Sequence, residues 1–311
     1  MSNMKIAIIV IAFNRPARLK NLLDKLIPQC INLELPVYIN IDGPKLKNDS
    51  LVDYTVKTAL DYTNEFNVFL QSNHENLGCR SSVIKAIDNA FKNYDAVIVI
   101  EDDLIISNDF ILFMTHSLSF YKDYNDVGSI SGYSLKLPVT SNYTNYFLHR
   151  PSSWGWATWR DRWESAIWNY DQVLSDSYAN VNDKMGQDFL RMFNKQRKNK
   201  ISSWAVDWGM SHHLNNWVTV VPWISKVENN GFGADATHCS TLRNPYPSSF
   251  SNEAIYEEYV FDSNPKIDQS NLKQFLHYYS NLYKIQFKTK DFLLKHLKNV
   301  TIYPENNSKS T

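Results

Sequence analysis

The sequence predicts an α/β fold with a mostly parallel sheet and helices on both faces. Two short runs, Lys5–Ala12 and Ala96–Ile100, are almost wholly apolar and rich in isoleucine or valine, which is typical of strands buried on both faces. Segments with helical periodicity lie between these runs. Strands that alternate with helices along a chain favour a parallel sheet covered by helices on each side.

A helix is expected directly after the first strand. Asn14 can cap it, and Pro16 suits its first turn. The leucines that follow recur with the spacing of one helical face: Leu19, Leu22, Leu23 and Leu26. This helix is therefore expected to pack back on the strand.

Two further strands and a second helix are expected before Ala96–Ile100. The strands are Val37–Asp42, which is ended by Gly43-Pro44, and Asn67–Leu70. The helix begins at about Arg80. Its apolar residues share one face: Val83, Ile84, Ile87 and Phe91.

The bulk composition excludes several classes of protein. With 43% hydrophobic and 21% charged residues, the 311-residue chain is expected to be globular. Its 32 basic residues balance 32 acidic ones, so no strong positive field supports nucleic-acid binding. No apolar run reaches the ~18 residues of a membrane span. Three scattered cysteines form neither a disulfide framework nor a zinc motif, so we expect a cytoplasmic protein: Cys30, Cys79 and Cys239.

The composition changes along the chain. All nine tryptophans lie between Trp154 and Trp223. We therefore expect a nucleotide-binding half at 1-133, an aromatic-rich substrate half at 134-270, and a C-terminal helical region with a polar tail at 271-311, all within one folded unit.

Three adjacent carboxylates, Glu101-Asp102-Asp103, follow the strand Ala96–Ile100. Ligands bind at the carboxyl ends of strands in open parallel sheets. Adjacent carboxylates repel one another unless a cation compensates, and Mg²⁺ or Mn²⁺ typically bridges one or two of them to substrate phosphates. The alternative is a solvated acidic turn.

Two more candidates lie at the ends of other strands. Asp42 can accept hydrogen bonds from a base or a ribose, or can simply form an Asp-Gly turn. Arg15, at the start of the first helix, suits a diphosphate, although a surface arginine is the plainer interpretation. No glycine-rich loop follows the first strand, which argues against a dinucleotide fold and a P-loop.

The aromatic half offers a candidate base and candidate sugar contacts. In a helix capped by Ser202 or Ser203, Trp204, Asp207 and Trp208 share one face. An aspartate there can act as general base on a sugar hydroxyl, and indole faces can stack on sugar rings. The alternative is a favourable first-turn aspartate beside core tryptophans.

Two other segments have both a functional and a structural interpretation. The segment Asn229–His238 has two glycines and resembles a loop that closes over a ligand, or else an ordinary turn. The segment Ser152–Trp159 contains three indoles, which form either a wall of the acceptor cleft or local core.

Taken in order, these motifs resemble the inverting GT-A glycosyltransferases of the N-acetylglucosaminyltransferase I type and their bacterial family-2 relatives. The resemblance covers roughly Lys5–His238, and the acidic triplet takes the place of the DXD motif. The segments that carry it are Val10–Arg15, Ile41–Gly43, Glu101–Leu104 with Asp109-Phe110, Trp154–Ala157, Trp204–Trp208 and Gly231–His238.

On the donor side, the resemblance implies roles for single residues. Asp103 matches the metal-binding position, Asp102 the position near the ribose, and Glu101 the position nearer the donor sugar. Arg15 matches a phosphate or nucleotide contact, and Asp42 the acid that binds the base.

The resemblance assigns the remaining residues to the acceptor side and to the closing segment. Asp207 matches the catalytic base, and His238 or Thr237 falls in the segment that closes on the donor. Arg80, in a segment closer to bacterial family-2 transferases, is a further candidate donor contact. The candidate acceptor contacts are Trp154, Trp156, Trp204 and Trp208.

The implied reaction is a metal-dependent single displacement with inversion. Mn²⁺ or Mg²⁺ and Arg15 stabilise the leaving nucleotide diphosphate, and Asp207 takes the proton of the acceptor hydroxyl. The expected donor is a UDP-sugar carrying a hexose or N-acetylhexosamine. The expected acceptor is a glycan or lipid-linked glycan of a bacterial surface polysaccharide. The alternatives are a sugar nucleotidyltransferase and an inactive carbohydrate-binding protein of the same fold.

The C-terminal segment 283-300 is locally basic in a neutral chain. Five lysines alternate with apolar residues, and Asp291 is its only acidic residue. Such a helix either lies on an anionic membrane surface or docks its leucines on the core. The first alternative predicts a peripheral contact at the inner face of the cell membrane.

Overall fold

The computed structural model describes residues 4–46, 49–65, 67–168, 178–231, 244–253 and 258–300, with side chains placed up to residue 293. Across these ranges, eight strands form one sheet in the order β3-β2-β1-β4-β8-β6-β9-β7. A smaller two-stranded sheet pairs β10 with β5 in antiparallel fashion.

The first four strands are parallel to one another and confirm the predicted α/β sheet. The expected strands appear at the predicted places, with ends that differ by one or two residues. Their bounds are Ile6–Ala12 for β1, Val37–Ile41 for β2, Val68–Ser72 for β3 and Ala96–Glu101 for β4.

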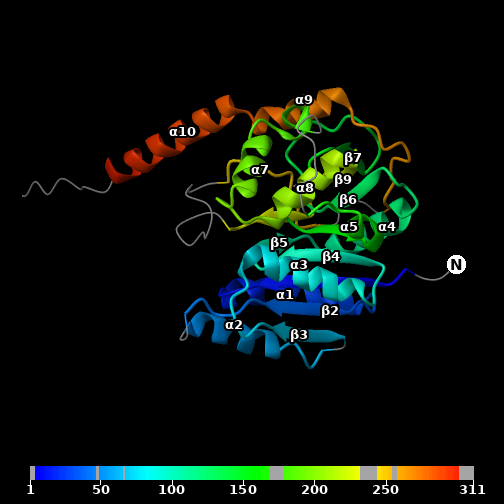
Figure 1. Cartoon of the computed structure of the whole chain (residues 1–311), viewed down its shortest axis with the longest axis vertical. Coiled ribbons are helices and arrows are strands. Elements are labelled where there is room, and N and C mark those ends of the chain that lie inside the picture. The colour runs from blue at the N-terminus through cyan, green and yellow to red at the C-terminus, as the bar shows by residue number, and fades with distance from the viewer. Residues whose placement is uncertain are drawn as a thin grey trace, which may run out of the picture.

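Helices cover both faces of this part of the sheet (Figure 1). The helices here are α1 (Pro16–Ile31), α2 (Ser50–Leu60) and α3 (Gly78–Phe91). Successive residues of β1 point to opposite faces. Ile8 and Val10 pack in the core that contains α1, whereas Ala7 and Ile9 pack in the core that contains α3.

The aromatic-rich half extends the same sheet. Its strands are β6 (Val127–Ser131), β7 (Asn145–Leu148), β8 (Trp156–Trp159) and β9 (Val218–Pro222). Strand β8 is antiparallel to both β4 and β6, β6 is parallel to β9, and β7 is antiparallel to β9. The sheet is therefore mixed, with parallel pairings in the majority.

The remaining elements surround this half of the sheet. Strands β5 (Leu104–Ile106) and β10 (Val227–Asn229) form the small sheet beside the end of β4. The helices are α4 (Phe110–Tyr121), α5 (Arg160–Glu164), α6 (Val181–Met185), α7 (Phe189–Arg197), α8 (Trp204–Leu214), α9 (Gln269–Tyr278) and α10 (Asn281–Val300). Within the described ranges, none of the helices combines the length and apolar character needed to cross a membrane.

Candidate active site

The acidic triplet and Arg15 meet at one edge of the sheet. Strands β1 and β4 are neighbours and parallel, so their carboxyl ends lie side by side. Glu101 ends β4, and Arg15 precedes the first residue of α1. The Arg15 Nη1 donates to Asp103 Oδ2 at 2.9 Å and lies 3.5 Å from Asp102 Oδ1.

Burial and mutual repulsion perturb the triplet. Burial, followed by the charges of Asp103 and Asp102, raises the pKa of Glu101 to about 8. Burial and then the Asp103 charge raise the pKa of Asp102 to about 7, while Arg15 acts in the opposite direction. Arg15 and, more weakly, Arg18 oppose this rise without cancelling it, so the site favours a further cation.

Asp103 has the features of a metal ligand. Its Oδ1 is buried and has no hydrogen-bond partner among the described residues. Among all the residues that the structure describes, no group of three or more His, Cys, Asp or Glu side chains is suited to hold a metal ion. An ion held by one or two carboxylates and completed by substrate phosphates and water is what Mg²⁺ and Mn²⁺ sites require. The residues present therefore fit such an ion.

The segment after β10 lies against Asp103. Because β10 pairs with β5, it brings the backbone N–H of Asn230 to the Asp103 carbonyl at 3.1 Å. A Cβ at Gly231 would lie 2.4 Å from Asp103 Oδ2, so a larger residue here would displace the Asp103 side chain. The segment Asn229–His238 thus begins at the candidate metal ligand. Thr237 and His238 lie outside the described residues.

Asp42 is engaged within the protein. Its carboxylate accepts hydrogen bonds from the backbone N–H of Gly43, Leu77 and Gly78 and from the Asn73 side chain, at 2.9 to 3.3 Å. These bonds fix the connection between β3 and α3 beside the end of β2. A contact between Asp42 and a nucleotide base remains a prediction.

The buried Asp207 forms an ion pair with the partly exposed Arg80. The Arg80 Nε on α3 donates to Asp207 Oδ2 on α8 at 2.7 Å, and Gln196 Nε2 on α7 donates to the same oxygen at 3.1 Å. The Asp207 side chain is 1% exposed. Burial raises the pKa of Asp207, and the bonds from Arg80 and Gln196 oppose this rise. Nothing in the sequence links Arg80 to Asp207, because 127 positions separate them.

Three of the four candidate acceptor tryptophans occupy the core instead. Trp156, Trp204 and Trp208 are buried in the hydrophobic cluster between the sheet and helices α3 and α8. The rings of Trp156 and Trp204 stack at 5.0 Å. Buried rings have no face for a sugar, so the core interpretation holds for these three. They lie there because Trp156 on β8 and the two tryptophans on α8 belong to the same cluster as the buried residues of α3.

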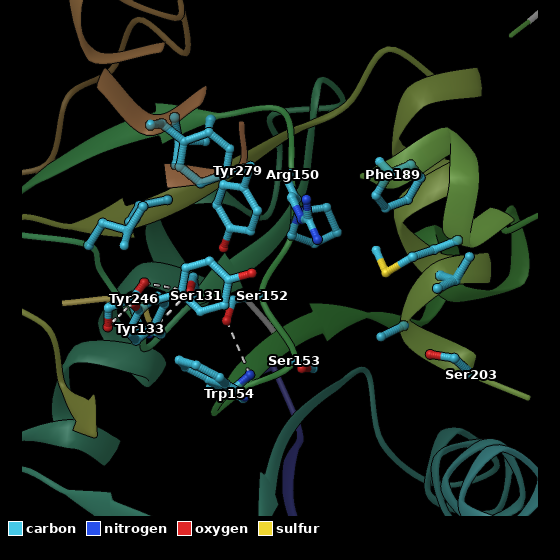
Figure 2. Close-up of a pocket in the computed structure, with 18 of the residues that line it drawn as sticks. Ser131, Tyr133, Arg150, Ser152, Ser153, Trp154, Phe189, Ser203, Tyr246 and Tyr279 are labelled. Atoms are coloured by element: carbon cyan, nitrogen blue, oxygen red, sulfur yellow. Dashed lines mark hydrogen bonds between the residues drawn. The ribbon is translucent and has the colours of Figure 1, made fainter. Parts of the chain in front are cut away.

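Trp154 lines a cavity of 240 Å³ on the other side of β8. Figure 2 shows Tyr133, Arg150, Tyr246 and Tyr279 around the same space as Trp154. Trp154 contacts Tyr133 edge-on, with ring centroids 4.6 Å apart. The sequence does not single out Tyr133, Arg150, Tyr246 or Tyr279, because they come from segments far apart in the chain.

Residues of the cavity wall are neighbours in the chain of segments that carry or contact the candidate reactive groups. Ser203, Ala205 and Val206 line it and lie at the start of α8, directly before Asp207. Next in the chain to the lining residues Tyr133 and Trp154, the Gly132 N–H donates to the Gly155 carbonyl, and a Cβ at Gly155 would lie 2.8 Å from Val227 of β10. Strand β10 leads to the segment that touches Asp103.

Arg150 gives this cavity a charged wall. Its guanidinium donates to both oxygens of Asp188, at 2.8 and 3.4 Å, and to the Met185 carbonyl at 2.7 Å. It also lies 4.1 Å from the centroid of the Tyr279 ring. The cavity thus combines aromatic faces with one fixed cation, a combination suited to a polar ring-shaped ligand.

Comparisons with known proteins give only remote structural likenesses. No family model matches the chain, and no curated protein matches it. One similar solved structure is the mannosyltransferase PcManGT from Pyrobaculum calidifontis in complex with GDP-Man and Mn²⁺. It is 15% identical, the match covers 52% of this chain and 46% of that chain, and the TM-score is 0.37.

Two structures of TarS from S. aureus are also similar. The structure over residues 1-349 is 14% identical, covers 70% of this chain and 58% of that chain, and has a TM-score of 0.40. The second is 14% identical, covers 70% of this chain and 35% of that chain, and has a TM-score of 0.39. This chain thus spans less than two thirds of the length of each of these proteins. At such TM-scores, the likenesses establish no activity for it.

Proposed function

We propose that this chain is a metal-dependent glycosyltransferase that moves a sugar from a nucleotide diphosphate donor to a hydroxyl of a glycan. The observation that carries the proposal is the buried Oδ1 of Asp103, which lies without a hydrogen-bond partner among the described residues at the edge of the parallel strands. Arg15 and Gly231 border the same carboxylate. The ordered resemblance to inverting GT-A enzymes supports the proposal.

On the donor side, Asp103 would hold Mn²⁺ or Mg²⁺. When bound, the ion supplies positive charge that stabilises the departing diphosphate. Arg15 shares that task, because its guanidinium already lies beside the triplet and suits phosphate oxygens. Asp102 and Glu101 face the ribose and the donor sugar in this proposal, and Asp42 faces the base. We infer a UDP-sugar as donor from the resemblance.

On the acceptor side, the cavity next to Trp154 receives the glycan and Asp207 takes its proton. Ser203, Ala205 and Val206 line the cavity at the start of α8, and Asp207 is the next residue of that helix. Arg80 and Gln196 fix the orientation of the carboxylate. In an inverting displacement, the acceptor hydroxyl attacks the anomeric carbon on the face opposite the leaving diphosphate. We propose a bacterial surface polysaccharide as the context.

The test measures metal binding and turnover separately. We expect wild-type protein to bind Mn²⁺ in a titration followed by electron paramagnetic resonance, and to release nucleoside diphosphate in a screen of donor sugars. Asp103→Asn keeps the shape of the side chain and removes its charge, so both Mn²⁺ binding and turnover should be lost. Asp123→Asn serves as the matched control, because Asp123 is exposed after α4.

Two outcomes would overturn the proposal. Turnover of Asp103→Asn in the presence of a chelator would exclude a metal at this position. Release of pyrophosphate from a nucleoside triphosphate and a sugar 1-phosphate, without sugar transfer, would identify a nucleotidyltransferase instead.

A further inference from the structure

Helix α10 is attached to the body at its first turn and then extends away from it (Figure 1). Lys284 Nζ lies 2.7 Å from Asp188 Oδ2. The Tyr283 hydroxyl donates to the Pro245 carbonyl at 2.7 Å, and the Asn281 N–H donates to Gln187 Oε1 at 2.8 Å. These contacts fix which face of the helix is turned toward the body.

Apolar side chains gather on the opposite face. The inner face carries Tyr283, Phe287 and Asp291, which recur every fourth residue, and Asp291 is only 5% exposed. The outer face carries four large apolar side chains that are more than half exposed. Their exposed fractions are 64% for Leu282, 63% for Ile285, 58% for Phe292 and 53% for Leu293.

Lysines flank this apolar strip on both sides. At about 100° per residue, Lys288 lies beside Phe292 on one edge, and Lys290 lies beside Leu293 on the other. Both lysines are exposed. Asp291, the only acidic residue of segment 283-300, is turned inward. The outward surface of the described part of α10 therefore carries large apolar side chains around Thr289 and lysines along its edges; the Thr289 hydroxyl donates to the Ile285 carbonyl of the same helix.

We propose that this outer face of α10 lies on an anionic lipid bilayer, parallel to its surface. Apolar side chains enter the boundary between headgroups and acyl chains, while lysines extend to lipid phosphates. Charge favours this occupant over a second copy of the chain. A symmetric pairing of two α10 strips would bring Lys288 and Lys290 of both copies together, and like charges at such a contact are unfavourable. Anionic headgroups complement the same lysines.

The sequence allows either a membrane-facing helix or a core-facing one, and the exposed face supports the first. Leu293 is half exposed, whereas the side chains of Leu294 and Leu297 lie outside the described part of the chain. The inference does not depend on the proposed activity, because its evidence and its test concern binding alone.

The experiment is cosedimentation of the full chain with vesicles. We expect binding to vesicles of phosphatidylcholine with 30% phosphatidylglycerol at ~20 mM salt, and much weaker binding at ~500 mM salt, where charges are screened beyond about 4 Å. Pure phosphatidylcholine vesicles should bind weakly. Each lysine is expected to contribute about fivefold in affinity, which corresponds to ~1 kcal/mol.

Two variants separate the apolar and charged contributions. Ile285→Ser with Leu293→Ser should reduce binding to the anionic vesicles at least tenfold. In the variant Lys288→Glu with Lys290→Glu, vesicle binding should no longer depend on phosphatidylglycerol. The matched control is Leu51→Ser with Leu60→Ser on α2, because both side chains are similarly exposed far from α10 along the chain. Circular dichroism checks that each variant is folded.

Three outcomes would overturn the inference. The first is an absence of binding to the anionic vesicles at low salt. The second is equal loss of binding in the α2 control and in the α10 variant. The third is a dimer in analytical ultracentrifugation that dissociates in Ile285→Ser with Leu293→Ser, because that result would assign the strip to a second copy.

Discussion

Asp207 shows how neighbouring side chains decide what one carboxylate can do. Three helices converge on it, because Arg80 comes from α3, Gln196 from α7 and Asp207 from α8. Burial favours the neutral acid, whereas the guanidinium favours the carboxylate. A proton acceptor held in this way is preorganised, but its charge depends on one ion pair.

We expect Asp207→Asn to lower both activity and stability. Turnover should fall by about 10²–10⁴, which is typical for loss of a general base. The free energy of unfolding should fall by about 1–2 kcal/mol in urea denaturation, because Arg80 loses its buried partner but remains partly exposed. Asp161→Asn is the control. Its side chain is 65% exposed beside Arg162, and a change beyond about 0.5 kcal/mol there would contradict the burial argument.

His212 is a second residue whose protonation is controlled by burial. It is fully buried, with Nδ1 3.0 Å from the Trp208 carbonyl and Nε2 2.8 Å from the Ser129 hydroxyl. Burial lowers the pKa of His212 to about 3. The folded protein therefore keeps the ring neutral at a pH where the unfolded chain takes up a proton.

This pKa shift predicts acid sensitivity. Below the ordinary histidine pKa of about 6.5, the unfolded state binds more protons than the folded state, so stability falls as the pH decreases toward about 3. Between pH 7 and pH 4.5, His212 should account for roughly 2–3 kcal/mol of lost stability. Urea unfolding of wild type and His212→Asn at both pH values measures it. An identical loss of stability in both proteins would show that protonation of His212 does not contribute to the acid sensitivity.

At the scale of elements, β8 separates two groups of tryptophans with different roles. Trp156, on β8, packs with Trp204 and Trp208 of α8 in the core. Trp154, two residues earlier, lies on the cavity side with Tyr133 and Tyr246. The turn at Gly155, with a φ of 57°, allows the chain to change direction between the two.

Alanine substitutions should separate these roles. Trp208→Ala is expected to cost about 3–5 kcal/mol of folding free energy, because it leaves a large cavity in the core. Trp154→Ala should cost less than half as much, since its ring is only partly buried. It should instead raise the KM for the acceptor. Thermal unfolding and steady-state kinetics measure the two effects, and similar stability losses in the two variants would contradict the assignment.

At the scale of the whole molecule, the two halves share one sheet. Strand β8 of the second half pairs with β4 of the first along Ala96 to Val99. A buried ion pair also links Lys226 with Asp109, and the Tyr259 hydroxyl donates to the same carboxylate at 2.8 Å. Shared pairing and a shared core favour unfolding as one unit.

We therefore expect a single cooperative transition. All nine tryptophans lie between Trp154 and Trp223, so their fluorescence reports on the second half and on its contacts with the first. Far-UV circular dichroism reports on the helices of both halves. The two signals should give the same midpoint in urea. Separate midpoints would show that 1-133 and the rest of the chain fold independently.

Sequence patterns were sufficient for strands β1 to β4 and helices α1 and α3, whereas α2 (Ser50–Leu60) was not predicted. A strand buried on both faces is apolar throughout, as at Ile6–Ala12 and Ala96–Glu101, and this property is visible without knowledge of its neighbours. Arg15 and the acidic triplet could be placed together for a related reason. Each directly follows one of these strands, and the ends of neighbouring parallel strands meet at one edge.

The acceptor side was decided by tertiary structure. The sequence alone determined that Asp207 lies on a helix among tryptophans, but only the fold placed Arg80 against it and turned Trp156, Trp204 and Trp208 into the core. The cavity beside Trp154 likewise joins residues from Ser131 to Tyr279. Periodicity records which face of an element is apolar. The partner of that face depends on contacts between segments over a hundred residues apart, which no local pattern specifies.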